Sequence, residues 1–387
     1  MSLMLEEALS APQRLREQWQ ANAAAMAALG GELREAGLRG AVTVARGSSD
    51  HAAAYFAYLG MKRLGLPIAS IPPSLTTLAG TPWRVSGQLA LAISQSGASP
   101  DLIATQRALA AGGARTLALV NAPDSELAAA SQHNLGLHAG VEHSVAATKS
   151  YLATLAAAAH LIAAWQGDPE LLSALERLPE RLESAAACDW QAAVEALSGA
   201  DRLLVIGRGV GLAVAQEAAL KFKETCGIQA EAFSAAEVKH GPMALIEPGY
   251  PVLVLAPPGP DQAGLLDLAT WLRGVGARVL LAADASVAGR ELDVNDAGHD
   301  DLQPLAVIQS FYVMAARLAV ARGGDPDCPR ASAEGDPNTL GYVRKLPALG
   351  NTALKIGSKC SFTPRKLRVF ANFCLVLPSL ADFSHRT

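Results

Sequence analysis

Short apolar runs alternate with longer helical patterns along most of the chain. Each run holds about four to six leucine-rich or β-branched residues, and the stretches between runs carry apolar positions at helical spacing. This alternation is typical of strand–helix–strand units, which associate into parallel sheets. The pattern therefore predicts an α/β protein.

The pattern occurs twice in the same order. In each copy a strand, a glycine turn and a helical pattern follow one another, with similar residues at matching positions. Three landmarks recur: 44–48 returns as 206–210, 91–97 as 253–259, and 113–117 as 276–280. We therefore expect two doubly wound parallel-sheet subdomains related by an internal repeat.

The repeat divides the chain into five segments. The expected segments are a lead-in helix at 5–24, a first subdomain at 25–170, a helical connector at 171–194, a second subdomain at 195–330 and a tail at 331–387. The tail has eight Lys or Arg residues against three acidic residues, while the whole chain has a net charge of −4. We expect this atypical tail to be disordered or non-native, with a functional basic arm as the alternative.

Composition argues against several classes of protein. The chain has 387 residues, 5% aromatic residues and a small net charge, so nucleic acid is not an expected partner. The alanine-rich run at 152–165 is too short to span a membrane, and the N-terminus lacks the pattern of a signal peptide. Five cysteines without a CxxC pair fit a reducing compartment. We expect a cytoplasmic protein with no membrane partner.

The turn after one apolar run of the first copy has residues suited to an anion. Ser94, Gln95, Ser96 and Ser99 surround a glycine just before a helix, whose free N–H groups favour negative charge. The matching turn of the second copy, 256–259, has two prolines and no hydroxyl group. The first turn is therefore a candidate phosphate site, with an ordinary capped loop as the alternative.

Two other turns of the first copy support phosphate binding. Ser49 follows the first strand, and Ala147 and Thr148 lead into a helix. The glycine-rich segment 207–211 lacks the third glycine and the acidic partner of a dinucleotide motif, and the sequence contains no Walker motif. A sugar phosphate is therefore favoured over a nucleotide.

The second copy supplies candidate acid–base groups. Glu217, Lys221 and Glu224 are spaced so that they share one helix face, where a solvated salt-bridged stripe is the alternative. His240 lies between charged residues and a Gly-Pro turn, and a loop histidine can move protons near neutral pH. The alternative for His240 is a solvated loop side chain without a chemical role.

The other histidines carry less weight. His133, His138 and His143 match no standard zinc spacing, so we expect no metal site. His51 and His160 are interpreted as helix residues packed beside alanines.

Four segments together resemble a known family. They are 94–97 (Ser-Gln-Ser-Gly), Glu142 with 145–149 (Val-Ala-Ala-Thr-Lys), 219–224 (Ala-Leu-Lys-Phe-Lys-Glu) and 235–242 (Ala-Ala-Glu-Val-Lys-His-Gly-Pro). Over about residues 5–330 the chain resembles the double sugar-isomerase (SIS) domain proteins, specifically the isomerase half of glucosamine-6-phosphate synthase.

The resemblance, together with the turns described above, implies roles for individual residues. The residues assigned to binding a hexose or hexosamine 6-phosphate are Ser49, Ser94, Gln95, Ser96, Ser99, Ala147 and Thr148. Glu224 would move a proton between C1 and C2 with Lys221 beside it. His240 would open the sugar ring, acting from the partner subunit of a homodimer. This chemistry requires no metal and no cofactor.

Two departures from the family refine the expected function. The synthase has an N-terminal glutamine-hydrolysing domain, whereas this chain starts almost directly with its sugar-isomerase unit. We therefore expect a stand-alone glucosamine-6-phosphate deaminase/isomerase that releases ammonia and forms fructose 6-phosphate. After 325–330 the family continues with a lysine that can form a Schiff base; that lysine is absent here, and Lys345 is a conceivable substitute.

Other functions stay open at the level of sequence. A glutamine–fructose-6-phosphate aminotransferase, a fructosamine-6-phosphate deglycase or a galactosamine-6-phosphate deaminase would use the same phosphate site and proton shuttle. A non-catalytic sugar-phosphate sensor would keep the serine-rich turns. The presence of both Glu224 and His240 favours an enzyme.

Overall fold

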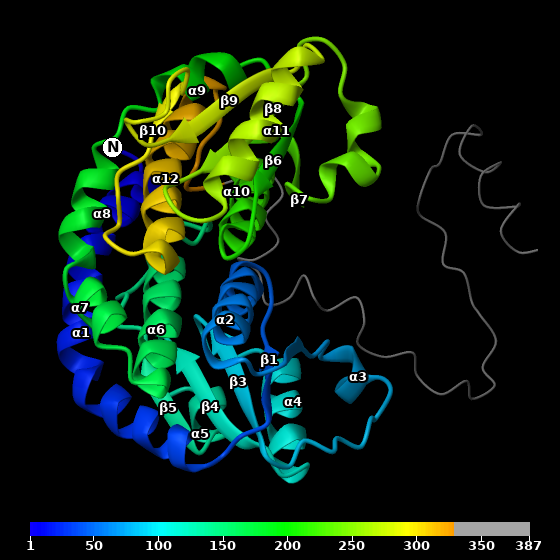
Figure 1. Cartoon of the computed structure of the whole chain (residues 1–387). Helices are drawn as coiled ribbons and strands as arrows, with labels where there is room; N and C mark the ends of the chain where they lie inside the picture. The colour runs from blue at the N-terminus through cyan, green and yellow to red at the C-terminus, as the bar shows by residue number, and fades with distance from the viewer. Residues whose placement is uncertain (329–387) are drawn as a thin grey trace, which may run out of the picture. The chain divides into compact units, whose positions relative to one another are not determined.

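The computed structural model describes residues 1–328, and each repeat contains one five-stranded parallel sheet (Figure 1). The strand orders are β2-β1-β3-β4-β5 and β10-β9-β8-β6-β7, which are the same order when the second is read backwards. Every strand pair in both sheets is parallel. The predicted α/β fold with two doubly wound subdomains is therefore confirmed. The tail expected at 331–387, Lys345 included, lies outside the described residues.

The strands coincide with the apolar runs of the sequence. The first sheet contains β1 (Gly40–Val44), β2 (Ile68–Ser70), β3 (Gln88–Ser94), β4 (Arg115–Val120) and β5 (His133–Gly136). The second contains β6 (Arg202–Gly207), β7 (Gln229–Ser234), β8 (Pro251–Ala256), β9 (Arg278–Ala283) and β10 (Leu292–Asp293). The central strands are buried along most of their length, which is why they appear as continuous apolar runs rather than alternating ones.

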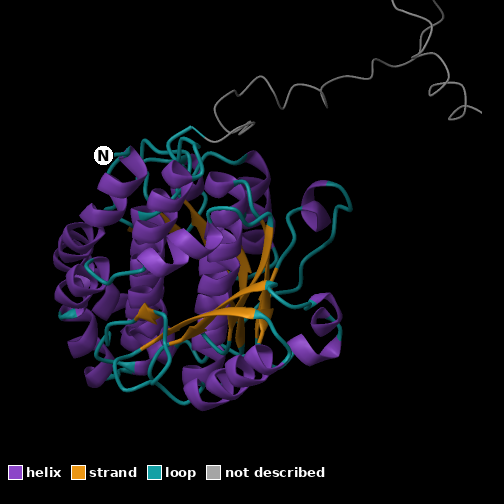
Figure 2. Ribbon diagram, turned by 90° about the horizontal axis from the view of Figure 1, so that it is seen from above, coloured by secondary structure: helices purple, strands orange, loops and turns teal. Residues whose placement is uncertain are grey.

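Helices cover the strands on both sides (Figure 2). In the first repeat and the connector they are α1 (Leu3–Glu35), α2 (Ser48–Leu64), α3 (Ser74–Thr77), α4 (Pro100–Ala111), α5 (Glu126–Ala129), α6 (Lys149–Gln166), α7 (Pro169–Glu176), α8 (Leu178–Ala186) and α9 (Gln191–Leu197). In the second they are α10 (Gly211–Cys226), α11 (Gln262–Gly274) and α12 (Gln303–Ala321), with the 3₁₀ turns η1 (Val238–His240), η2 (Pro242–Leu245) and η3 (Asp300–Leu302).

A single hydrophobic core joins the two repeats. In the first sheet Leu89 and Leu91 face this shared core, while their neighbours Ala90 and Ala92 face a separate outer cluster. Helices α2, α6, α10 and α12 lie between the sheets and contribute many residues of the shared core. The two repeats therefore bury their inner faces against each other.

Helix α1 runs past residue 24, where we expected the lead-in helix to end, and continues to Glu35. Gly30 and Gly31 would normally favour the end of a helix. Gly30 instead packs against the backbone of Ala164 in α6, so closely that a Cβ atom at position 30 would collide with it. Helix packing thus overrides the local preference of the glycine pair.

One segment that the sequence analysis did not single out is apolar and long enough to cross a membrane. It comprises η3 and α12, residues Asp300–Ala321, with a mean hydropathy of 1.5. Within the described structure, 83% of its most apolar window is buried, because α12 packs against α1, α8, α9 and α10. Burial in a protein core accounts for this composition.

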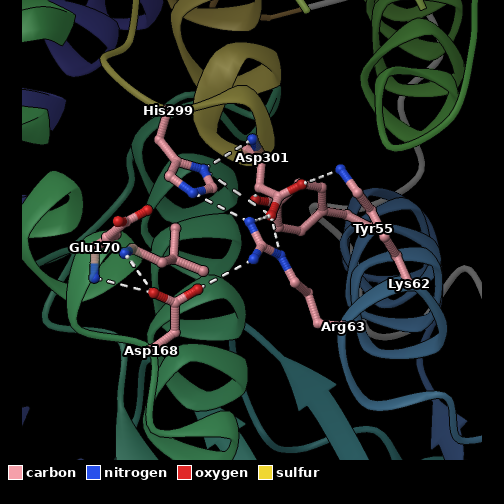
Figure 3. Close-up of polar contacts among 8 residues, drawn as sticks. Tyr55, Lys62, Arg63, Asp168, Glu170, His299 and Asp301 are labelled. Carbon is pink, nitrogen blue, oxygen red and sulfur yellow. Dashed lines mark hydrogen bonds and ion pairs between the residues drawn. The ribbon is translucent and has the colours of Figure 1, made fainter. Parts of the chain in front are cut away.

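A network of charged side chains also joins the repeats, and Figure 3 shows it. Asp301 of η3 is fully buried, and its carboxylate accepts hydrogen bonds from Lys62 and Arg63 of α2. Arg63 also reaches Asp168, which caps α7, and contacts the ring of His299. The start of α12 is thereby fixed to the end of α2.

Candidate active site

The serine-rich turn of the first repeat follows β3 and leads into α4. Ser94 is buried, and its Oγ accepts a hydrogen bond from the Gly97 N–H at 3.0 Å. Gly97 has a φ of +62° and packs against Ser125, so only glycine fits there. Gln95 and Ser96 are exposed and Ser99 is half-buried. The turn thus presents hydroxyl and N–H groups to solvent at the N-terminus of α4.

The corresponding turn of the second repeat has different chemistry. It runs from 257 to 260 and lines a pocket with Arg208, Asp261 and the start of α12. Three of its four residues are prolines, which lack an N–H donor. An ion pair joins Arg208 to Asp261 at 3.4 Å. The first repeat has an equivalent pair, Arg46 with Asp101, so the ion pair occurs in both repeats, whereas the hydroxyl and N–H groups of the first turn do not recur in the second.

A loop before α6 holds the third predicted turn. Thr148 is fully buried, and both its N–H and its hydroxyl group donate to the Glu142 carboxylate, at 2.7 and 3.2 Å. Burial raises the pKa of Glu142, and a hydrogen bond from Ser150 opposes that rise. Ala147 is half-buried beside this network. The Thr148 hydroxyl therefore has a protein partner, Glu142, in this loop.

The acid–base residues of α10 form a stack. Lys221 Nζ lies 2.5 Å from Glu224 Oε2 and 3.4 Å from Glu217 Oε1. Glu217 and Lys221 are buried, whereas the Glu224 side chain is 30% exposed. The alternative interpretation of these residues as a solvated salt-bridged stripe is therefore wrong for Glu217 and Lys221. The stack places its outermost carboxylate where a ligand can reach it.

The charges of the stack stabilise one another. Burial alone would lower the pKa of Lys221, but the carboxylates of Glu217 and Glu224 raise it above its usual value. Burial alone would raise the pKa of Glu217, but the charge of Lys221 and a hydrogen bond from His51 lower it. Lys221 is therefore an ammonium group at neutral pH, and Glu217 is a carboxylate.

Three residues near the stack were missed by the sequence analysis. Ser48 Oγ and Tyr312 OH donate to Glu217 Oε1, at 3.0 and 3.2 Å, and His51 Nδ1 lies 2.9 Å from Glu217 Oε2. His51 lies in α2 beside alanines, as expected, and its ring also contacts Glu217. Helices α2 and α10 are equivalent elements of the two repeats and pack against each other, which brings His51 to Glu217. The internal repeat indicated that α2 and α10 are equivalent helices, but it did not give the angle at which the two copies pack.

His240 is the last residue of η1, and it is exposed. Gly241 follows with a φ of +146°, and neighbouring Lys239 lies over the ring of Trp271. Ser49 lies in the first turn of α2, next to Ser48, whose hydroxyl group donates to Glu217 of the stack.

Comparison with known proteins identifies the class of this fold and site. The SIS domain family matches residues 36–164 and 196–287, one segment in each repeat, and the chain belongs to this family. The resemblance noted in the sequence is thereby confirmed.

Among proteins of known name, this chain is similar to aminotransferases that act on fructose 6-phosphate, as their names state. The chain is 36% identical over 297 residues to glutamine–fructose-6-phosphate aminotransferase (isomerizing) of Methanothermobacter thermautotrophicus, covering 74% of this chain and 50% of that protein. It thus spans about half the length of the curated relatives it matches.

Two solved structures are also similar. A Silicibacter pomeroyi DSS-3 protein assigned as a phosphosugar isomerase is 40% identical with a TM-score of 0.81, over 84% of this chain and 100% of that one. The C-terminal domain of glucosamine-fructose-6-phosphate aminotransferase from Francisella tularensis is 25% identical with a TM-score of 0.76, over 85% and 98%.

Proposed function

We propose that the protein is a glucosamine-6-phosphate deaminase/isomerase. The observation that carries this proposal is the Lys221–Glu224 pair, a buried ammonium 2.5 Å from a partly exposed carboxylate. Such a carboxylate stays ionised and can accept a proton from carbon. Relatives named as aminotransferases and phosphosugar isomerases support a sugar-phosphate substrate.

The proposed reaction moves two protons within the sugar and then uses one water molecule. Glu224 removes the proton from C2 of the open-chain amino sugar and returns it to C1, while O1 gains the proton that the amine nitrogen loses; together these transfers convert the aldehyde with a C2 amine into a C1 alcohol with a C2 imine. Water then adds to the imine, and ammonia leaves, so that fructose 6-phosphate is formed. Lys221 keeps Glu224 ionised between turnovers.

The 6-phosphate is assigned to the serine-rich turn. Ser94, Gln95, Ser96 and Ser99 surround the N-terminus of α4, where N–H groups and the helix dipole favour an anion. Ser49, Ala147 and Thr148 are assigned to the sugar end of the site, with Thr148 acting through the loop that it holds.

Ring opening is assigned to His240 in a cytoplasmic homodimer. The exposed position of His240 supports a role in the site of a second subunit. In that arrangement the imidazole of the partner subunit's His240 would protonate the ring oxygen as the C1 hydroxyl loses its proton.

Ammonia release from a set of 6-phosphates tests the proposal. We expect turnover with glucosamine 6-phosphate above galactosamine 6-phosphate and fructosamine 6-phosphate. If ammonia were released only from galactosamine 6-phosphate or only from fructosamine 6-phosphate, that compound would be the substrate in place of glucosamine 6-phosphate. Binding without any turnover would indicate a sugar-phosphate sensor.

Mixed subunits test the role of His240. Chains carrying His240→Ala and chains carrying Glu224→Gln should each be inactive alone and regain activity after subunit exchange, because one hybrid site then has both groups. Confirmed exchange without recovery would place His240 outside the neighbouring site.

A further inference from the structure

The carboxylate of Glu217 contacts side chains from both repeats. It lies on α10 with no exposed side-chain surface. Its Oε1 atom accepts from Ser48 and Tyr312 and faces Lys221 at 3.4 Å. Its Oε2 atom faces His51 Nδ1 at 2.9 Å, from the other repeat.

The two oxygens of this carboxylate are supported unequally. Within residues 1–328, Oε1 has three polar partners, whereas Oε2 has one, the ring of His51. An ionised carboxylate only accepts hydrogen bonds, so the contacting Nδ1 atom of His51 carries a hydrogen. A buried carboxylate oxygen that loses its donor is strongly disfavoured in the charged state.

We propose that His51 is a positioning residue for proton transfer, acting from the first repeat on the acid–base stack of the second. His51 holds Glu217 as a carboxylate, Glu217 holds the Lys221 ammonium, and Lys221 in turn orients Glu224. This inference rests on the proposed function, since it gives His51 a part in the same reaction. His51 touches no substrate in this scheme.

The surroundings of Glu217 decide how it responds to loss of His51. The titratable groups that face the stack are His51 from α2, Tyr151 from α6, Tyr312 from α12, Glu142 from the loop before α6, and Lys221 and Glu224 from α10. Both tyrosines have a raised pKa because they are buried, so they stay neutral. Without His51, the pKa of Glu217 rises, and a protonated Glu217 no longer shares Lys221 with Glu224. Glu224 then binds Lys221 more tightly and becomes a weaker base.

Two substitutions separate the hydrogen bond from the bulk of the ring. In His51→Asn the amide nitrogen takes the place of Nδ1, whereas in His51→Gln it takes the place of Nε2. We expect His51→Asn to keep kcat within about threefold and His51→Gln to lose about tenfold to a hundredfold, the range for one hydrogen bond to a charged group. His133→Gln, at the partly exposed start of β5, is the matched control and should be unchanged.

The pH dependence distinguishes a positioning role from a packing defect. In His51→Gln the acid limb of kcat should follow the raised pKa of Glu217, which must be ionised for full activity, and move to higher pH by about one unit, equivalent to a tenfold effect. The thermal unfolding midpoint should fall most near neutral pH, and the deficit should shrink at low pH, where Glu217 is protonated in both proteins.

The unfolding measurement needs no substrate, so it decides the role of His51 toward Glu217 even if glucosamine 6-phosphate is not turned over. Absence of turnover by the unsubstituted protein would count against the proposed function alone. Equal losses in His51→Asn and His51→Gln, or a loss that does not change with pH, would overturn the inference about His51.

Discussion

Arg63 donates through Nε to the buried carboxylate of Asp301, 2.5 Å away, across the junction of the two repeats. Lys62 Nζ donates to the other oxygen of Asp301 at 2.7 Å, and Arg63 continues to Asp168 at 3.1 Å. Tyr55 OH donates to the Asp301 carbonyl group. A single acidic side chain therefore satisfies two cations of α2 at the point where the second repeat begins its last helix.

Replacing Asp301 should destabilise the whole protein. Asp301→Ala leaves Arg63 without its main counter-charge in a mostly buried position, and we expect a loss of about 3 kcal/mol in the free energy of unfolding. Urea unfolding measures this loss. The adjacent, exposed Asp300 is the control, and Asp300→Ala should change stability by less than about 0.5 kcal/mol. Equal effects at both positions would contradict the importance of the junction.

The glycine pair of α1 gives opposite predictions for adjacent residues. Gly30→Ala should destabilise, because the added Cβ atom meets the backbone of Ala164. Gly31→Ala adds a methyl group with only the end of Arg34 nearby, so it should stabilise by about 0.5 to 1 kcal/mol through helix propensity. Thermal unfolding of both variants tests the close contact of α1 with α6. A stabilising Gly30→Ala would show that the two helices are not packed this closely.

His160 makes stability depend on pH. Its ring stacks on Trp19, and burial lowers its pKa to about 4. Below the ordinary histidine pKa of about 6.5, the unfolded chain binds a proton that the folded chain does not, so stability falls as pH decreases toward 4. This group should account for a loss of about 3 kcal/mol over that window.

His160→Leu should flatten the corresponding part of the stability profile. The partly exposed His133 is the control, and His133→Leu should leave the slope in place. Urea unfolding at several pH values between 4 and 7 measures both. An unchanged slope in His160→Leu would mean that this histidine is protonated in the folded protein.

Glu224→Gln should abolish turnover and spare binding. The amide keeps the shape of the side chain but cannot accept a proton, so binding of the sugar phosphate should stay within about tenfold, or roughly 1.4 kcal/mol. Exchange of solvent deuterium at C1 or C2 follows the proton transfer directly. If Glu224→Gln exchanged deuterium as fast as the unsubstituted protein, Glu224 would not be the residue that transfers the proton.

The serine-rich turn should carry the affinity for the 6-phosphate. Ser96→Ala and Ser94→Ala should each weaken binding by about 1.5 to 3 kcal/mol, as expected for a hydrogen bond to a charged group. Pro258→Ala, in the equivalent turn of the second repeat, should leave affinity unchanged. Titration calorimetry compares the three variants, and similar losses at both turns would argue against an asymmetric phosphate site.

The sequence predicts the sheets well and the contacts between repeats poorly. Strands such as β3 are buried on both faces, so their apolar runs are visible without any tertiary information. The spacing of Glu217, Lys221 and Glu224 likewise follows from one helix. The contact of His51 with Glu217 depends on how two helices from different repeats cross, and no local pattern contains that information. The length of α1 was missed for the same reason, because Gly30 is explained only by its neighbour in α6.

Helix α1 has a consequence for synthesis of the chain on the ribosome. Its first turns contact the end of the second repeat: Asp327 accepts from the N–H groups of Leu3 and Met4, and Gln309 of α12 donates to the Ala8 carbonyl group. The last turns of α1 instead pack on α6 of the first repeat. A nascent chain that has released only the first repeat therefore exposes the apolar start of α1, and remains a target for chaperones until α12 has emerged.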